Sequence, residues 1–239
     1  MKSWSSLFVM IALAWVLGAC TVDEYESGDG HYSYLRADFA MVHTSSSGKI
    51  NHMLTDAGDA VVFDAPWTAS WATKADSVYR ALVYYDVSTN RYLSSAPVIV
   101  TSPAQFSPGI TVPTDPLTIE STWVSGGFFN IAFAVKAGRT DSVGIVRKMG
   151  LIFDNHASAG GSRRTVDIRI FHAQNGIPEY YTVRGYMSMP LANAWQGAVI
   201  RLRANTYEGE KTYVSQVPAS PSHASSSPVD FLLRHHNCP

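Results

Sequence analysis

The stretch Phe129-Asn130-Ile131-Ala132-Phe133-Ala134-Val135 (FNIAFAV, residues 129–135) alternates large apolar side chains with small or polar ones. Successive side chains of a β-strand point to opposite faces, so the four large residues share one face. An amphipathic helix would instead place apolar residues three and four positions apart. The stretch therefore predicts a β-strand that turns one apolar face to a core.

The same period of two recurs along most of the chain and predicts an all-β protein. In 78–85, one face carries Tyr79, Ala81, Val83 and Tyr85, and Arg80 lies on the other. Patterns that alternate strands with helices are absent, which argues against a nucleotide-type α/β fold. Many short strands between turns are typical of a sandwich or barrel. The other predicted strands cover 34–42, 50–54, 60–63, 97–101, 143–153, 166–170, 180–187, 200–204 and 212–214.

Turns and a proline-rich stretch divide these strands into two groups. Residues 103–116 contain four prolines and a glycine, a composition that resists both helix and central strand. We take this stretch as a linker between a domain at 33–102 and a second domain at 117–214. Hairpin turns are expected at 56–58 and 208–211. The Ser/Pro/Ala-rich residues 215–239 are expected to form a disordered tail.

The N-terminus has the features of an export signal. Lys2 precedes an uncharged apolar run from Leu7 to Leu17, which is too short to cross a bilayer comfortably as a helix. The residues Leu17, Gly18, Ala19 and Cys20 then resemble a bacterial lipobox. The resemblance implies cleavage of a signal peptide at 1–19 and lipidation of Cys20. The alternative is an uncleaved hydrophobic anchor with an incidental cysteine.

Residues 20–32 would then be a lipidated, flexible tether. The acidic run 21–26 beside the lipid resembles the surface-export signals of Bacteroidetes lipoproteins, and a plain solvated spacer explains it equally well. Two or three acyl chains would hold the protein to a membrane lastingly, because each buried methylene contributes about 0.8 kcal/mol. We therefore expect anchoring to the outer membrane of the cell envelope, with the surface as one possible face.

Charge and cysteine content exclude several classes of protein. The chain has 18 Lys and Arg against 19 Asp and Glu, and loss of Lys2 would bring the net charge to −2. Such a chain has no basic excess for nucleic-acid phosphates. Of the 2 cysteines, Cys20 is predicted to carry lipid, so Cys238 has no partner for an intramolecular disulfide.

Five phrases, taken in their order along residues 33–214, resemble the NigD-like lipoproteins of Bacteroidetes. The resemblance implies an OB-like β-barrel at 33–102 and a β-sandwich at 117–214. It implies no catalytic residue, and it suggests an immunity or accessory role only through the name of the family's prototype. Phe129 stands where the family has leucine, a conservative change. The phrases are RADFAMV (36–42), LTDAGDAV (54–61), YRALVYY (79–85), WVSGGFFNI (123–131) and GYMSMPL (185–191).

The sequence offers no catalytic or metal-binding constellation that outweighs a structural explanation. Residues 45–49 end in Gly-Lys but lack the glycine and the Ser or Thr of a phosphate loop. Asp154-Asn155-His156, like Asp56 and Asp59 around Gly58, is typical of turns, and a calcium loop needs more oxygens. We therefore predict no enzyme, no metal and no cofactor. The remaining metal-binding residue types, His235, His236 and Cys238, lie in the tail expected to be disordered.

Aromatic residues are the best candidates for ligand contact. Trp67 and Trp71 lie between predicted strands, where they would stack on a sugar or peptide, or else close the end of the barrel. We favour the second interpretation for both. Trp123 and Trp195 flank apolar strands and are expected in the core. The pair Arg163-Arg164 is expected at a solvated turn rather than at an anion site.

Three functions remain open, in this order. The first is a non-catalytic module that is bound to the membrane by its lipid and recognises a protein, peptide or glycan. The second is a bacteriocin immunity factor. The third is a hydrolase of envelope or glycan polymers, which requires two carboxylates that the fold brings together.

Overall fold

The computed structural model describes residues 34–105, 109, 111–139, 146–154 and 164–219. By its contacts the chain falls into two units, Met1–Leu35 and Arg36–Pro239, and the second contains all the strands apart from the first residue of β1. The predicted signal peptide, Cys20 and the tether lie outside the described residues, and so does the tail from residue 220.

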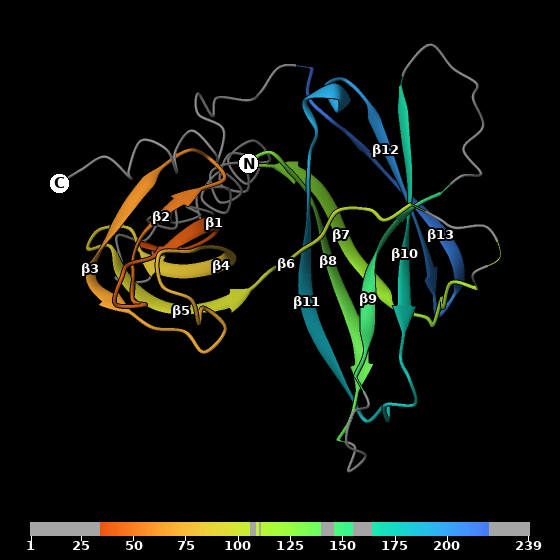
Figure 1. Cartoon of the computed structure of the whole chain (residues 1–239), viewed down its shortest axis with the longest axis horizontal. Coiled ribbons are helices and arrows are strands. Elements are labelled where there is room, and N and C mark those ends of the chain that lie inside the picture. Colours follow the sequence, from red (N-terminus) through yellow and green to blue (C-terminus); the bar gives the residue numbers. More distant parts are fainter. Residues whose placement is uncertain (1–33, 106–108, 110, 140–145, 155–163, 220–239) are drawn as a thin grey trace, which may run out of the picture. The chain divides into compact units, whose positions relative to one another are not determined.

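The N-terminal strands form one curled antiparallel sheet. The strands are β1 (Leu35–Thr44), β2 (Ile50–Thr55), β3 (Ala60–Trp67), β4 (Val78–Asp86) and β5 (Arg91–Pro97). Their order in the sheet is β3-β2-β1-β4-β5, and Figure 1 shows the curl. The edge strand β3 meets the β4–β5 turn, where the Asp64 N–H donates to the Asn90 carbonyl at 3.2 Å. This half-barrel fits the predicted OB-like architecture.

Period-two alternation gives this sheet its core. Ala81, Val83 and Tyr85 of β4 are buried in one cluster with Val42 of β1 and Met53 of β2. Arg80 lies on the opposite face of β4, as the sequence predicts, yet it is only 3% exposed.

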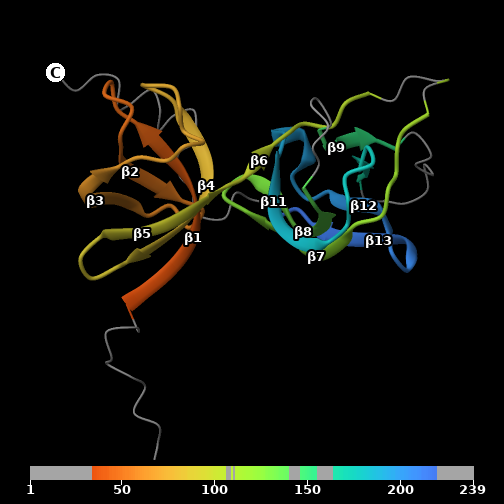
Figure 2. The ribbon, with the colours of Figure 1, turned by 90° about the horizontal axis from the view of Figure 1, so that it is seen from below.

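The C-terminal strands form a sandwich of two four-stranded sheets. One sheet has the order β13-β12-β10-β9 and the other β6-β11-β8-β7, and both are visible in Figure 2. The β10–β12 and β6–β11 pairs are parallel, whereas the other strand pairs of the sandwich are antiparallel. A 3-10 turn, η2 (Asn193–Trp195), precedes β12. The strands are β6 (Ile99–Val100), β7 (Thr118–Ser125), β8 (Phe128–Ala137), β9 (Lys148–Phe153), β10 (Thr165–Ala173), β11 (Tyr181–Pro190), β12 (Val199–Thr206) and β13 (Gly209–Gln216).

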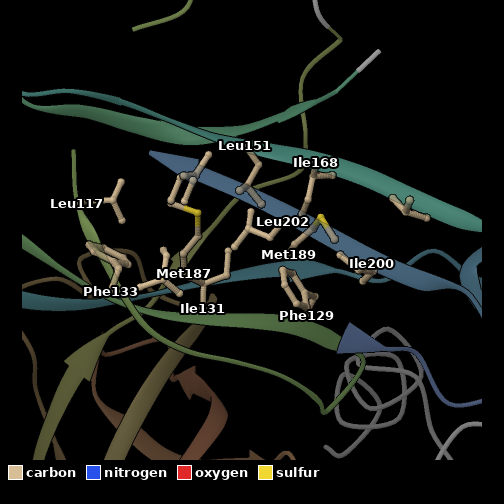
Figure 3. Packing of buried hydrophobic residues seen from close by; sticks show 14 of the residues in the cluster. Leu117, Phe129, Ile131, Phe133, Leu151, Ile168, Met187, Met189, Ile200 and Leu202 are labelled. Carbon is tan, nitrogen blue, oxygen red and sulfur yellow. The ribbon is translucent and has the colours of Figure 1, made fainter. Parts of the chain in front are cut away.

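The core of the sandwich lies between its two sheets. Figure 3 shows Phe129, Ile131 and Phe133 of β8 reaching towards Leu151 of β9 and Ile168 of β10. The four large residues of the 129–135 stretch are all in this cluster, which confirms the strand predicted from their alternation. The opposite face of β8 is buried as well. Within its sheet, β8 lies between β11 and β7.

Several local predictions were wrong. The sequence pattern missed β5, and the strand expected at 97–101 is reduced to β6, which pairs with β11 of the sandwich. The hairpin turn expected at 208–211 lies at 207–208 instead. The strand β13 continues to Gln216, so the first residues assigned to a disordered tail are in the sheet, and Val217 is buried in the core.

Gly150 of β9 lies against an aromatic ring of the neighbouring strand. Gly150 lies in regular register with Phe171 of β10, so β9 has no bulge there. A Cβ at position 150 would come within 2.6 Å of the Phe171 ring. The glycine therefore leaves room for an aromatic ring on the neighbouring strand.

Candidate functional site

The first polar cluster surrounds Arg80 and is called the Arg80 cluster below. The Arg80 side chain is fully buried and forms a bidentate ion pair with Asp56, in which both N···O distances are 2.8 Å. Nε donates to the Ser188 hydroxyl at 2.8 Å, and Nη2 also donates to Asn130 Oδ1 at 3.0 Å. The remaining N–H of Nη1 points to the Met41 sulfur at 3.9 Å. All five guanidinium N–H donors thus have acceptors, as a buried arginine requires.

Asp56 and Asn130 connect Arg80 to a second layer of partners. The Ser125 hydroxyl donates to Asp56 at 2.6 Å, while the Asn130 amide donates to Ser125 at 3.0 Å. The Ser188 hydroxyl donates to Asn130 Oδ1 at 2.6 Å. The network therefore joins β4 and the β2–β3 turn to β7, β8 and β11.

Aromatic rings enclose this network. The Arg80 guanidinium lies 3.9 Å from the centre of the Phe128 ring, a cation–π distance. Phe39 of β1 makes edge-to-face contacts with Trp123 at 5.1 Å and with Tyr186 at 5.2 Å between ring centres. Because every donor of Arg80 is used and the charge is enclosed, the Arg80 cluster is a joint and not an open binding site.

Each phrase that carries the family resemblance contributes to the Arg80 cluster. Nothing in the strand pattern alone required these separate phrases to meet in space. The residues are Phe39 and Met41 from 36–42, Asp56 from 54–61, Arg80 from 79–85, Trp123, Ser125, Phe128 and Asn130 from 123–131, and Tyr186 and Ser188 from 185–191.

Gly126 shows how closely the two sheets approach at this joint. Its φ is +56°, and an added Cβ would lie 2.2 Å from Asp56 Oδ1. Glycine is the residue that tolerates both the backbone conformation and the contact. The neighbouring Gly127 also has positive φ, +80°, but has nothing within 4 Å of the same position.

The second cluster lines a pocket at one end of the sandwich, called the Trp195 pocket below. Its volume is about 460 Å³, within the range of about 300–1,000 Å³ typical of small-ligand sites. Trp195 and Phe153 meet edge to face, with ring centres 6.2 Å apart. The lining residues are Gln105, Phe153, Asp154, Arg164, Thr165, Val166, Asp167 and Trp195.

The fold brings together two carboxylates in this pocket. Phe153 of β9 pairs with Ile168 of β10, which makes Asp154 and Asp167 the next cross-strand neighbours. The backbone N–H of Asp154 donates to the Asp167 carbonyl at 3.0 Å.

Arginines on the outer face of the sheet bind both carboxylates. Asp154 Oδ2 lies 3.3 Å from Arg169 and 3.3 Å from Arg203, and Asp167 Oδ1 lies 2.5 Å from Arg201 Nε. A glycosidase needs one of its two carboxyl groups to donate a proton to the leaving group. Both carboxylates of the pocket contact arginine side chains, and the hydrolase hypothesis stays a prediction.

Burial displaces the pKa values of Tyr85, His172 and Tyr186. Burial, followed by a hydrogen bond to Asp38 at 2.8 Å, raises the pKa of Tyr85 to about 12. Burial lowers the pKa of His172, although its Nδ1 lies 3.0 Å from the Asp115 carbonyl. Burial also raises the pKa of Tyr186 at the Arg80 cluster. None of the three lines the Trp195 pocket.

The structure places Trp67 and Trp71 in the aromatic core of the half-barrel. Trp67 is 8% exposed and stacks on Tyr92, with ring centres 3.9 Å apart. Trp71 is partly exposed and makes edge-to-face contacts with Trp67 and Tyr79. This packing fits the interpretation that both close the end of the barrel, and their contact with a ligand stays a prediction.

Other predicted positions have different outcomes. Trp195 packs against the sandwich core, as expected, but also lines the pocket. Trp123 belongs to the Arg80 cluster and not to either apolar core. Asp56 lies in the expected turn, but its carboxylate binds Arg80. Arg164 is exposed and donates to the Ala194 carbonyl. The predicted residues outside the described part are Leu17, Gly18, Ala19, Cys20, Asn155, His156, Arg163, His235, His236 and Cys238.

The described ranges give two further results. They contain no group of three or more His, Cys, Asp or Glu side chains placed to hold a metal ion. They also contain no helix with the length and hydrophobicity needed to span a membrane.

Comparison with known proteins identifies the sandwich. Residues 105–217 match the model of the NigD-like C-terminal β-sandwich domain. No curated protein matches the chain.

Solved structures from Bacteroidetes share the fold. A NigD-like immunity protein from Bacteroides caccae is 20% identical with a TM-score of 0.56, and the match covers 75% of this chain and 91% of that one. A protein from Parabacteroides distasonis is 17% identical with a TM-score of 0.57, over 78% of this chain and 94% of that one. A protein of unknown function from Bacteroides vulgatus is 16% identical with a TM-score of 0.56, over 82% and 98%. The fold of this chain is thus similar to that of the NigD-like immunity protein from Bacteroides caccae, and residues 105–217 match the model of the NigD-like C-terminal β-sandwich domain.

Proposed function

We propose that this chain is a non-catalytic binding module, anchored by lipid on Cys20 to the outer membrane of the cell envelope. Its ligand is a protein, peptide or glycan that enters the Trp195 pocket. The N-terminal half-barrel serves as a support, fixed to the sandwich through the Arg80 cluster.

The composition of the Trp195 pocket carries the proposal. An aromatic ring lies beside carboxylate, guanidinium, amide and hydroxyl groups, a combination that fixes and orients a ligand. The carboxylates are already held by Arg169, Arg201 and Arg203, so they are fixed in place before a ligand arrives. Such preorganisation favours binding because fewer side chains must be ordered.

The predicted anchor supports the envelope location. A chain whose lipidated cysteine is followed by a polar spacer would place the β-domains beside the membrane and free to meet partners there.

Site-specific photo-crosslinking in intact cells tests the proposal. A photoreactive residue replaces Thr165, which is exposed and lines the pocket, and in a matched control it replaces Thr182, an exposed threonine on β11. We expect an adduct of defined mass from position 165 and none from position 182. Equal labelling at both positions, or none at either, contradicts the proposal.

A bacteriocin immunity role is the second candidate, favoured by the likeness to the immunity protein from Bacteroides caccae. An immunity factor would also be a non-catalytic binder, with a toxin as its partner. Deleting the gene should then raise sensitivity to the matching toxin, and expression of the intact gene should restore resistance. Unchanged sensitivity argues against this role and leaves the binding proposal standing.

A further inference from the structure

We infer that the Trp195 pocket binds a neutral saccharide, with a sugar ring against Trp195 and a sugar hydroxyl donating to Asp167. The inference rests on the proposed function and narrows its ligand to one chemical class.

Asp167 has an acceptor that no described residue uses. Its side chain is 5% exposed, and its Oδ1 binds Arg201 Nε at 2.5 Å. The other oxygen, Oδ2, is buried and has no hydrogen-bond partner among the residues that the structure describes. Buried polar atoms are nearly always paired, so an unpaired carboxylate oxygen on a pocket-lining residue points to a donor supplied from outside.

The local charge favours a neutral donor over a cation. Arg201 already balances Asp167, while Arg169 and Arg203 both contact Asp154. A metal ion or an ammonium group would add positive charge next to three arginines, and like charges at close range repel. A hydroxyl group donates a hydrogen bond without adding charge.

The rest of the lining suits a sugar ring. Trp195 is partly exposed and held edge to face by Phe153, so its ring has a fixed orientation for stacking on the C–H face of a sugar. Arg164 is anchored on the carbonyl of Ala194, next to Trp195, which places a donor at the rim. Gln105 and Thr165 add an amide and a hydroxyl, and both donate and accept hydrogen bonds.

Calorimetric titration of the purified mature chain tests the inference. The probes are trisaccharides of glucose, xylose, mannose and N-acetylglucosamine in defined linkages, together with trilysine and calcium chloride. We expect at least one saccharide to bind with a Kd in the micromolar to millimolar range, with a change in tryptophan fluorescence, and no binding of trilysine or calcium.

Substitutions assign the binding to the pocket. Trp195→Ala should weaken saccharide binding at least tenfold, and Asp167→Asn should weaken it about as much. Glu120→Gln is the matched control for a carboxylate paired with an arginine outside the pocket, and should leave the Kd unchanged. Thermal unfolding of each variant shows whether a loss of binding reflects a loss of fold.

Three results overturn the inference. They are no saccharide binding by the folded chain at millimolar concentration, binding that survives Trp195→Ala, and binding of trilysine or calcium in place of sugars. An adduct at Thr165 to a protein partner, with no saccharide binding, overturns the sugar assignment and leaves the proposed binding function intact.

Discussion

Replacing Arg80 with methionine removes the charge at the centre of the Arg80 cluster and keeps a side chain of similar length. Asp56, whose side chain is 13% exposed, loses both guanidinium contacts, and Asn130 and Ser188 each lose one hydrogen bond. Removing one partner of a buried ion pair costs about 3–5 kcal/mol, because the other charge stays buried without its partner. For a chain of this size each kcal/mol lowers Tm by about 2–4 °C, so we expect a loss of roughly 6–20 °C.

Thermal and urea unfolding measure this loss against a surface control. Arg184→Met removes an arginine that is 73% exposed and bonded to Glu120, and an exposed ion pair contributes far less to stability than a buried one because water screens it. Asp56→Asn combined with Arg80→Met should cost less than the sum of the two single changes, because both act on one ion pair. If Arg80→Met and Arg184→Met lower the free energy of unfolding equally, the Arg80 cluster does not join the sheets as described.

Three further changes have expected outcomes. Gly126→Ala should cost about 1–3 kcal/mol more than Gly127→Ala in urea unfolding, because both share the strain of positive φ but only the first meets Asp56; equal costs would show that this contact is absent. Burial, assisted by a hydrogen bond, raises the pKa of Tyr85 to about 12 in the fold, so the contribution of Tyr85 to stability should be constant below about pH 10 and be lost as the pH rises towards 12. Tyr85→Phe should reduce that slope, and an unchanged slope would refute the assignment. Burial lowers the pKa of His172, so stability should fall as the pH drops below about 6.5, and His172→Gln should flatten the curve there.

The sequence predicted strands where alternation was strong and erred where it was weak. The 129–135 and 78–85 patterns lie in β8 and β4, as expected. The strand β5 was missed because its sequence, RYLSSAP, shows no regular period. The extension of β13 to Gln216 was missed because serine-rich composition indicated disorder, whereas the pairing of β13 with β12 decides the structure there.

The joint was harder to predict because its residues come from five separate segments. Asn130 and Arg80 were visible as polar positions within apolar strands, a pattern that alternation alone assigns to an outer face. The structure buries both because the two outer faces meet and the polar groups satisfy one another. The available signal was a polar residue, Asn130 or Arg80, within an otherwise apolar strand. Such a residue indicates a polar partner elsewhere in the chain.

The Trp195 pocket depends on the pairing of strands, which could not be predicted from the sequence pattern. Asp154 and Asp167 become neighbours through the β9–β10 register, and Trp195 reaches them from the η2 turn. Trp195 was correctly expected to pack against the core, but its second role at the pocket requires the placement of three elements. Trp67 and Trp71 were identifiable as clustered aromatics, and in the structure Trp67 stacks on Tyr92 while Trp71 meets Trp67 edge to face.

The proposed anchoring of the binding module to the membrane requires lipidation of Cys20. Cells expressing the full chain or its Cys20→Ser variant are grown with radiolabelled palmitate and separated into cytosol, inner membrane and outer membrane. We expect a labelled chain in the outer membrane and, for Cys20→Ser, no label and release from that membrane. An unlabelled chain in the cytosol, or equal labelling of both, would contradict this expectation.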